Sequence, residues 1–124
     1  MMKTQNMKYI YVAHPLRGAG ITTETVRENI RAVSRICLDI KEKHPDVLIL
    51  SPIHAYTFEP IDADDKWVLG QCRELLTLAD EIWVFGDWKT SKGCRMEIDF
   101  AYKNSIPIYI DGILTIDNPM HQEE

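Results

Sequence analysis

The chain has 124 residues, of which 45% are hydrophobic and 27% charged, and its formal net charge is −5. This is the composition of an ordinary globular protein, so it excludes collagen-like, mucin-like and disordered chains, and the length suits one domain with one core. A general nucleic-acid binder is expected to be basic, so the acidic balance argues against a nucleic-acid partner.

The sequence contains no apolar run near the ~18 residues that a membrane helix needs. The first eight residues are polar and lack the apolar centre of a signal peptide, so we expect a cytoplasmic protein with no membrane partner. Cys37, Cys72 and Cys94 are odd in number and widely spaced. This pattern favours buried or half-buried thiols over a disulfide framework or a structural zinc site. We expect no metal and no cofactor.

The N-terminal half predicts a strand, a helix, a second strand and an irregular segment. The first strand is a β-rich apolar run that ends at His14, and the helix repeats apolar residues at helical spacing. Thr22 or Thr23 can cap this helix, with Glu24 in its first turn. In chain order, the four segments are residues 8–13, the stretch from the cap to about 42, 46–51 and 52–63.

The C-terminal half predicts two more helices and two or three more strands. Its nearly continuous apolar run E-I-W-V-F-G is typical of a strand that is buried on both faces. The predicted helices are 64–79 and 93–104, the strands are 81–86 and 106–110, a short fifth strand falls within 112–117, and 117–124 is a loose tail.

Strands that alternate with helices indicate parallel β-α-β units and helices on both faces of one sheet. The sequence therefore predicts a single α/β domain over 1–124 with its core at about 8–111. Its fold is a small doubly wound, flavodoxin- or Rossmann-like parallel sheet of four to five strands.

In open α/β sheets, ligands bind beyond the carboxyl ends of the strands. The first loop there, H-P-L-R-G-A-G, leads into a helix start, where backbone N–H groups and Arg17 can bind an anion. The alternative for Arg17 is a solvated surface position. The loop is not G-x-G-x-x-G and the chain has no P-loop, so classical dinucleotide binding and ATP hydrolysis lose support. The candidate binding residues at this edge are His14, Arg17, Gly18, His54, Asp87, Trp88, Ser91 and Gly93.

The third loop carries the motif S-x-G-x-x-x-E-x-x-x-A, formed by Ser91, Gly93, Glu97 and Ala101. The last three share one helix face, and two small neighbours leave space that a substrate can fill. Glu97 lies about one turn from the helix start, where the helix dipole favours an anion. A carboxylate placed there can attack an electrophilic sugar carbon. The alternative is an ion pair with a basic residue of the same helix or of a neighbouring subunit.

Two further readings stay open at this edge. A metal site from His14 and His54 with Asp87 or Asp111 lacks close ligand spacing, and the simpler interpretation is that the histidines hydrogen-bond to backbone or ligand. Trp88 lies past the end of its strand, where it can stack on a base, cover the pocket or contact another subunit.

From Tyr9 to about Ile110 the sequence resembles the nucleoside 2-deoxyribosyltransferase-like superfamily, which includes 2′-deoxynucleoside 5′-monophosphate N-hydrolases. The resemblance is nearest to an uncharacterised bacterial and phage branch. It depends on the order and spacing of Y-V-A-H-P-L-R-G, A-D-E-I-W-V-F-G and S-K-G-C-R-M-E-I-D-F-A. It implies that the ligand is a small nucleoside or nucleotide, and that the protein is a homo-oligomer, a dimer or larger, with its site near the subunit interface.

The resemblance also implies roles for single residues. Glu97 would attack C1′ of a deoxyribose, displace the base and form a glycosyl-enzyme, which water or a second base would resolve. Tyr11 would lie under the sugar and Glu97, and Arg17, Gly18 and Ser91 would hold the 5′ end. The N-hydrolases share serine at the position of Ser91 where transferases tend to have aspartate, which favours a 5′-phosphate and hydrolysis.

One departure from the family pattern concerns Cys72. Both characterised branches have an aspartate there that holds the sugar or assists the leaving base, and a thiol is a poor replacement. His14 and His54 are further departures, which add acid–base groups to the ligand edge. Two functions therefore remain: an N-glycosidase with Glu97 as nucleophile, favoured by the retained glutamate, and a nucleotide-binding module without turnover, favoured by the lost aspartate.

Overall fold

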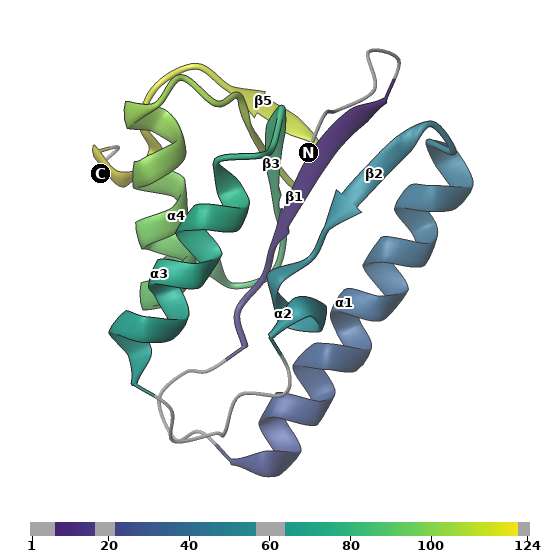
Figure 1. Cartoon of the computed structure of the whole chain (residues 1–124), viewed down its shortest axis with the longest axis vertical. Helices are drawn as coiled ribbons and strands as arrows, with labels where there is room; N and C mark the ends of the chain where they lie inside the picture. The colour runs from purple at the N-terminus through teal and green to yellow at the C-terminus, as the bar shows by residue number, and fades with distance from the viewer. Residues whose placement is uncertain (1–6, 17–21, 57–63, 122–124) are drawn as a thin grey trace.

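The computed structural model describes residues 7–16, 22–56 and 64–121 as an α/β fold with one five-stranded sheet of order β2-β1-β3-β4-β5 (Figure 1). The doubly wound fold that the sequence predicts is confirmed. The elements are β1 (Lys8–Ala13), α1 (Thr23–Lys43), β2 (Val47–Leu50), α2 (Pro52–Ala55), α3 (Asp65–Leu76), β3 (Glu81–Val84), the short 3-10 helix η1 (Trp88–Thr90), α4 (Lys92–Lys103), β4 (Ile108–Ile110), β5 (Ile113–Thr115) and the short 3-10 helix η2 (Pro119–His121).

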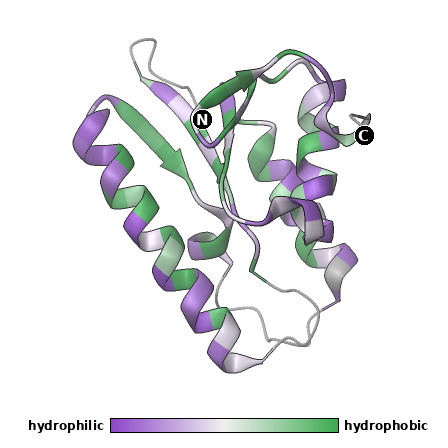
Figure 2. Cartoon of the chain, turned by 180° about the vertical axis from the view of Figure 1, so that it is seen from behind, coloured by the Kyte–Doolittle hydropathy of each residue, from purple (hydrophilic) through white to green (hydrophobic). Residues whose placement is uncertain are grey.

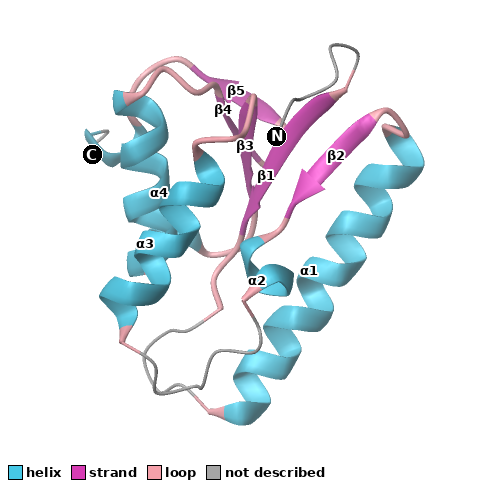
Figure 3. Ribbon diagram, in the orientation of Figure 1, coloured by secondary structure: helices cyan, strands magenta, loops and turns pink. Residues whose placement is uncertain are grey.

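Strand β1 lies at the centre of the parallel part of the sheet, between β2 and β3. Its side chains alternate between two hydrophobic clusters, because successive residues of a strand point to opposite faces. Ile10 and Val12 pack with α1, whereas Tyr11 and Ala13 pack with α3 and α4. The helices therefore cover both faces of the sheet, with α3 and α4 side by side on one and α1 on the other (Figure 3).

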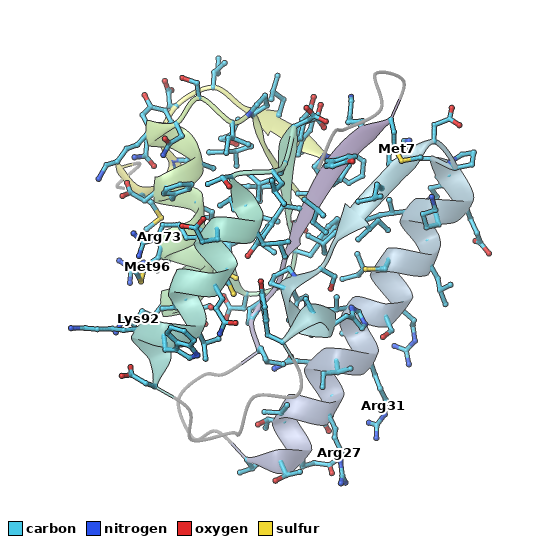
Figure 4. The ribbon with its side chains drawn as sticks, in the orientation of Figure 1. Met7, Arg27, Arg31, Arg73, Lys92 and Met96 are labelled. Atoms are coloured by element: carbon cyan, nitrogen blue, oxygen red, sulfur yellow. The ribbon has the colours of Figure 1, made fainter. Side chains whose placement is uncertain are left out.

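The helix α1 is amphipathic and capped at its start. The Thr22 hydroxyl accepts a hydrogen bond from the Thr25 backbone at 3.1 Å, and the Thr22 backbone N–H donates to the Thr25 hydroxyl at 3.0 Å, which forms a capping box. Hydrophobic and hydrophilic residues alternate along α1, whereas the strands are mostly hydrophobic (Figure 2). Arg27 and Arg31 project from the side of α1 that faces away from the sheet (Figure 4). The apolar side of the helix is thus left to cover Ile10 and Val12.

The fifth strand corrects the expectation of an all-parallel sheet, because β5 pairs antiparallel with β4. The two strands are joined by Asp111 and Gly112, which both have positive φ values, 50° and 84°. Asp-Gly in this conformation is the preferred two-residue hairpin turn. Asp111 is therefore a turn residue rather than the metal ligand that was considered for it.

Two further boundaries differ from the expectation. The segment expected to be irregular starts with the short helix α2, since Ser51 caps it and Pro52 occupies its first position. Residues 57–63 lie outside the described part. The helix α3 ends at Leu76, three residues before its predicted end at 79. Thr77 is its C-cap, and the Thr77 hydroxyl donates to the Glu74 carbonyl at 2.6 Å.

The expected loose tail is partly ordered. Residues 117–121 pack on α4 through η2. The Asn118 side chain is only 8% exposed, donates to Asp99 at 3.4 Å and accepts from the Met120 backbone at 3.0 Å. Met120 packs against the cluster that contains Tyr11. Polar capping by Asn118 and apolar burial of Met120 together hold this segment to the domain.

All three cysteines are free thiols, two of them buried and Cys37 half-buried, as the sequence predicts. Within the described ranges no helix is long and apolar enough to cross a membrane.

Candidate active site

Tyr11 and Glu97 form the central contact of the candidate site. Tyr11 lies in the middle of β1, is fully buried, and donates its hydroxyl hydrogen to Glu97 Oε2 at 2.5 Å. Glu97 lies one turn into α4, whose neighbour Ile98 is in the core. A residue at the centre of the sheet thus fixes the carboxylate of a residue 86 positions later in the chain.

The start of α4 is fixed by a buried serine. Ser91 is 5% exposed, and its hydroxyl oxygen accepts a hydrogen bond from the Cys94 backbone at 3.2 Å. This is the ordinary N-cap contact, which satisfies one of the free N–H groups of the first turn. The cap places Gly93 and Glu97 on the helix face that turns toward α3.

A cavity of about 120 Å³ opens beside this pair. One wall comes from α3 and α4, and the other from the residues that follow β1 and β2. Apolar side chains dominate the lining, and the polar groups are few, which is the usual character of a small-molecule site. The lining residues are His14, Leu16, Pro52, Ile53, Tyr56, Val68, Leu69, Cys72, Ser91, Lys92, Gly93, Cys94 and Glu97.

The surroundings of Glu97 raise its pKa from the ordinary 4.5 to about 7, because burial disfavours the charged carboxylate more than the Tyr11 hydrogen bond favours it. Burial, followed by the charge of Glu97 and contact with Cys72, raises the pKa of Tyr11 well above its ordinary value of 10. Tyr11 therefore stays a neutral donor at neutral pH, while Glu97 exchanges a proton near neutrality.

Glu97 makes no ion pair with its own helix among the described residues. Lys103, a candidate partner, pairs with Asp99 at 2.9 Å instead. The expected free space beside Glu97 exists only in part. Ala101 is buried in the core cluster, so protein atoms fill the space on its side. Gly93 lines the cavity, and a Cβ added there would lie 3.2 Å from the Leu69 side chain.

Four of the predicted site residues line the cavity: His14, Ser91, Gly93 and Glu97. Tyr11 does not line the cavity itself, but it is hydrogen-bonded to Glu97, which does. The predicted anion-binding pair, Arg17 and Gly18, lies outside the described residues.

The structure places His54 outside the cavity lining. Its Nδ1 bonds the Ser51 hydroxyl at 2.6 Å, and its Nε2 bonds the Ser34 hydroxyl of α1 at 2.8 Å. The short helix α2 therefore turns the imidazole toward α1, while its neighbours Pro52 and Ile53 face the cavity.

Asp87 and Trp88 also lie outside the lining. Asp87 is exposed at the start of η1. Trp88 is half-buried against the core cluster that contains Tyr11, and the Lys89 ammonium lies 5.6 Å from the centre of its ring. The indole thus supports the loop that leads to Ser91, and the expected stacking on a base stays a prediction.

Sequence reasoning missed Val68 and Leu69 of α3 and Cys94 of α4 as wall residues. The signal was present in the helical spacing. Val68 and Leu69 precede Cys72 by four and three residues, so the three share one helix face. Lys92 lies at the start of α4 and extends its side chain outward (Figure 4).

Within the described ranges, no group of three or more His, Cys, Asp or Glu side chains is arranged to hold a metal ion. His14 and His54 do not meet, since His54 bonds Ser34 and Ser51 while His14 lines the cavity.

The model of one protein family, a domain of unknown function (DUF7768), matches residues 8–111. No curated protein matches the chain at a significant level. The match covers every strand except β5 and contains all the residues that line the cavity.

Two solved structures share the fold. One is a conserved protein from Enterococcus faecalis V583, with a TM-score of 0.66 and 20% identity over 84% of this chain; the chain spans 62% of that protein's length. The other is a 2-deoxyribosyltransferase from Bacillus psychrosaccharolyticus, with a TM-score of 0.59 and 20% identity over 82% of this chain and 70% of the other. At this identity the likeness shows the fold.

Proposed function

The chain belongs to the family of the domain of unknown function DUF7768, and from the site of this member we propose that it is a nucleoside or nucleotide N-glycosidase. Glu97 is its nucleophile on the sugar carbon that carries the base. The main support for this proposal is the 2.5 Å hydrogen bond from buried Tyr11 to Glu97, which lines a cavity beyond the carboxyl ends of the strands.

The chemistry of this pair supports the proposal. A nucleophilic carboxylate must be held in one orientation and must be ionised when it attacks. Tyr11 supplies the orientation, because its hydroxyl is fixed by the sheet. A pKa of about 7 leaves a substantial fraction of Glu97 ionised at neutral pH.

The lining of the cavity supports a nucleoside-sized ligand. Its apolar side chains can cover a base and the carbon face of a sugar, and Ser91 and Lys92 offer polar groups near the helix start. Ser91, together with Arg17 and Gly18, is our candidate for holding the 5′ end. The sharing of a fold with a 2-deoxyribosyltransferase agrees with this substrate class.

The alternative function is a module that binds a nucleotide without cleaving it. One observation favours it: the α3 residue beside Tyr11 is Cys72, whose thiol cannot replace a carboxylate as a hydrogen-bond acceptor or proton carrier at neutral pH. Turnover separates the two functions.

A homo-oligomer stays part of the proposal. Ile113 is 72% exposed, Leu114 51% and Ile116 86%, which is unusual for aliphatic side chains on neighbouring residues. Sedimentation of the purified protein would give the subunit number directly.

The test is the release of free base, measured by chromatography, from a panel of 2′-deoxynucleosides and their 5′-monophosphates. The panel is run with wild type, Glu97→Gln and His54→Gln, the last as a control outside the cavity. We expect wild type and His54→Gln to release base and Glu97→Gln to lose at least about 10³-fold in rate. The absence of release by wild type, with a raised melting temperature in the presence of several panel members, would establish the binding module instead.

A further inference from the structure

His14 is a titratable side chain of the cavity to which the function proposed above gives no role. It follows β1 directly and lines the cavity. Glu97 belongs to α4, so two ionisable side chains from different elements line the same cavity.

The tautomer of His14 is fixed by a backbone contact. Its Nδ1 lies 2.7 Å from the Pro15 carbonyl oxygen. A carbonyl oxygen only accepts hydrogen bonds, so Nδ1 carries the hydrogen. The neutral ring then has its lone pair at Nε2, which makes no hydrogen bond within the described part of the chain.

Gly86 keeps a place open for the Nε2 side of this ring. A Cβ added to Gly86 would lie 3.0 Å from His14 Nε2 and 3.0 Å from the Pro15 ring, closer than such contacts normally are. Gly86 also has a φ of +79°, which other residues rarely adopt. Gly86 thus leaves room for the His14 and Pro15 rings where β1 and β3 end, and among the described residues only Nδ1 of the imidazole has a hydrogen-bond partner.

We propose that His14 is the acid–base residue of the reaction, and that its Nε2 exchanges protons with the leaving base and with the attacking water. The proposal rests on the function proposed above. It follows from two ionisable side chains in the lining of a single cavity: the Glu97 carboxylate, and an imidazole whose Nδ1 is fixed and whose Nε2 has no hydrogen-bond partner among the described residues. A double-displacement hydrolysis needs such a pair of a nucleophile and an acid–base group.

The proton balance closes over two steps. In the first, the Glu97 carboxylate bonds to C1′, the C1′–N bond breaks with its electron pair on the base, and Nε2 of protonated His14 gives its proton to the base. In the second, water bonds to C1′ while Nε2 takes its proton, and the C1′–O bond to Glu97 breaks. Both residues return to their starting states, and water is the acceptor.

The variant that isolates this role is His14→Asn. The asparagine amide can still donate to the Pro15 carbonyl, as Nδ1 does, but it has no group in place of Nε2. The other ionisable lining groups, Glu97, Lys92, Tyr56, Cys72 and Cys94, remain. His54→Asn is the matched control, since it removes an imidazole that lies outside the cavity.

The test uses 7-methyl-2′-deoxyguanosine and its 5′-monophosphate, whose cationic base leaves without an added proton. We expect His14→Asn to release about one equivalent of base per site rapidly and then to turn over at least about 10²-fold more slowly than wild type. Azide attacks without losing a proton, so it should restore turnover and give the 2-deoxyribosyl azide. His54→Asn should match wild type and gain nothing from azide.

The outcomes are distinct. If wild type and His14→Asn turn over equally, or azide has no effect on a slow His14→Asn, the role of His14 is refuted while the glycosidase stands. If wild type releases no base, both the proposed glycosidase function and the proposed role of His14 are refuted. A second measurement needs no turnover: ¹⁵N NMR of labelled imidazole should show Nδ1 protonated and Nε2 unprotonated in neutral His14, and the opposite tautomer would overturn the assignment.

Discussion

Two helix starts at the ligand edge of the sheet begin in the same way and lead to opposite results. Both α2 and α4 follow a serine N-cap, Ser51 and Ser91, whose hydroxyl accepts a backbone hydrogen bond from the third residue after it. In α2 that third residue is His54, whose ring bonds the cap and Ser34. In α4 the helix continues, and Glu97 reaches across to Tyr11.

The difference teaches what turns an ionisable residue at the ligand edge into a candidate catalyst. His54 is exposed, and both its nitrogens already have partners. Among the described residues Glu97 has one hydrogen-bond partner, Tyr11; it lies beside open space, and burial raises its pKa to about 7. For Glu97, a pKa raised by burial and free space beside the carboxylate mark the functional group, rather than position at the edge alone.

Among variants that test this difference between Glu97 and His54, we expect the largest effect on activity from Tyr11→Phe. The variant removes the donor that favours ionised Glu97, so the pKa of Glu97 rises further above 7 and less of the nucleophile is ionised at neutral pH. We expect the catalytic efficiency for base release at pH 7 to fall about 10²-fold, and the rise of rate with pH to move to higher pH. Ser34→Ala removes a hydroxyl that bonds His54. This variant should keep the catalytic efficiency within about twofold of wild type and leave the pH profile unchanged. An unchanged pH profile in Tyr11→Phe would contradict the role of the pair.

The next effect is on stability. The folded pKa of Glu97, about 7, is above its ordinary 4.5, so ionisation costs the folded state free energy. The contribution of protonated Glu97 to the free energy of unfolding is fully present below about pH 4.5 and is lost as the pH rises through about 7. The full shift corresponds to ~3.4 kcal/mol, and we expect about 2 kcal/mol because the residue is only half-buried.

Glu97→Gln should therefore match wild type in the free energy of unfolding at pH 4 and exceed it by about 2 kcal/mol at pH 9. Urea unfolding at both pH values gives this difference. A pH-independent difference between Glu97→Gln and wild type would refute the perturbed carboxylate.

The smallest effects concern the two caps. Ser91 is buried and begins a helix of 12 residues, whereas Ser51 begins one of 4. We expect Ser91→Ala to lower the free energy of unfolding by about 1.5 kcal/mol and Ser51→Ala by about 0.5 kcal/mol. Thermal unfolding of the two variants side by side would measure this, and equal losses would mean that the two helix starts are equivalent in stability.

The sequence predicted the α4 side of this comparison far better than the α2 side. The spacing of Ser91, Gly93 and Glu97 predicts both the helix cap and the helix face that Gly93 and Glu97 share, because a regular helix of 12 residues fixes where each side chain points. The four strands that alternate with helices likewise indicated the parallel part of the sheet, from their apolar runs alone.

The α2 side could not be predicted because its geometry depends on a turn of only 4 residues. Whether His54 faces the cavity or α1 is decided by the serine cap and by Ser34, 20 residues earlier in the chain. The hairpin at Asp111 differs for another reason: the Asp-Gly pair favours a tight turn over a ligand-binding residue at the end of β4.

The separation of Tyr11 and Glu97 by 86 residues has a consequence for how the protein is made. A contact between such distant segments forms only after the ends of a long loop have met, which is slow and comes late in folding. A partly synthesised chain that lacks α4 cannot form the contact between Tyr11 and Glu97. Reactivity should therefore appear in one step with the cooperative docking of α4 on β1, so its onset during refolding would time the last assembly event of the fold.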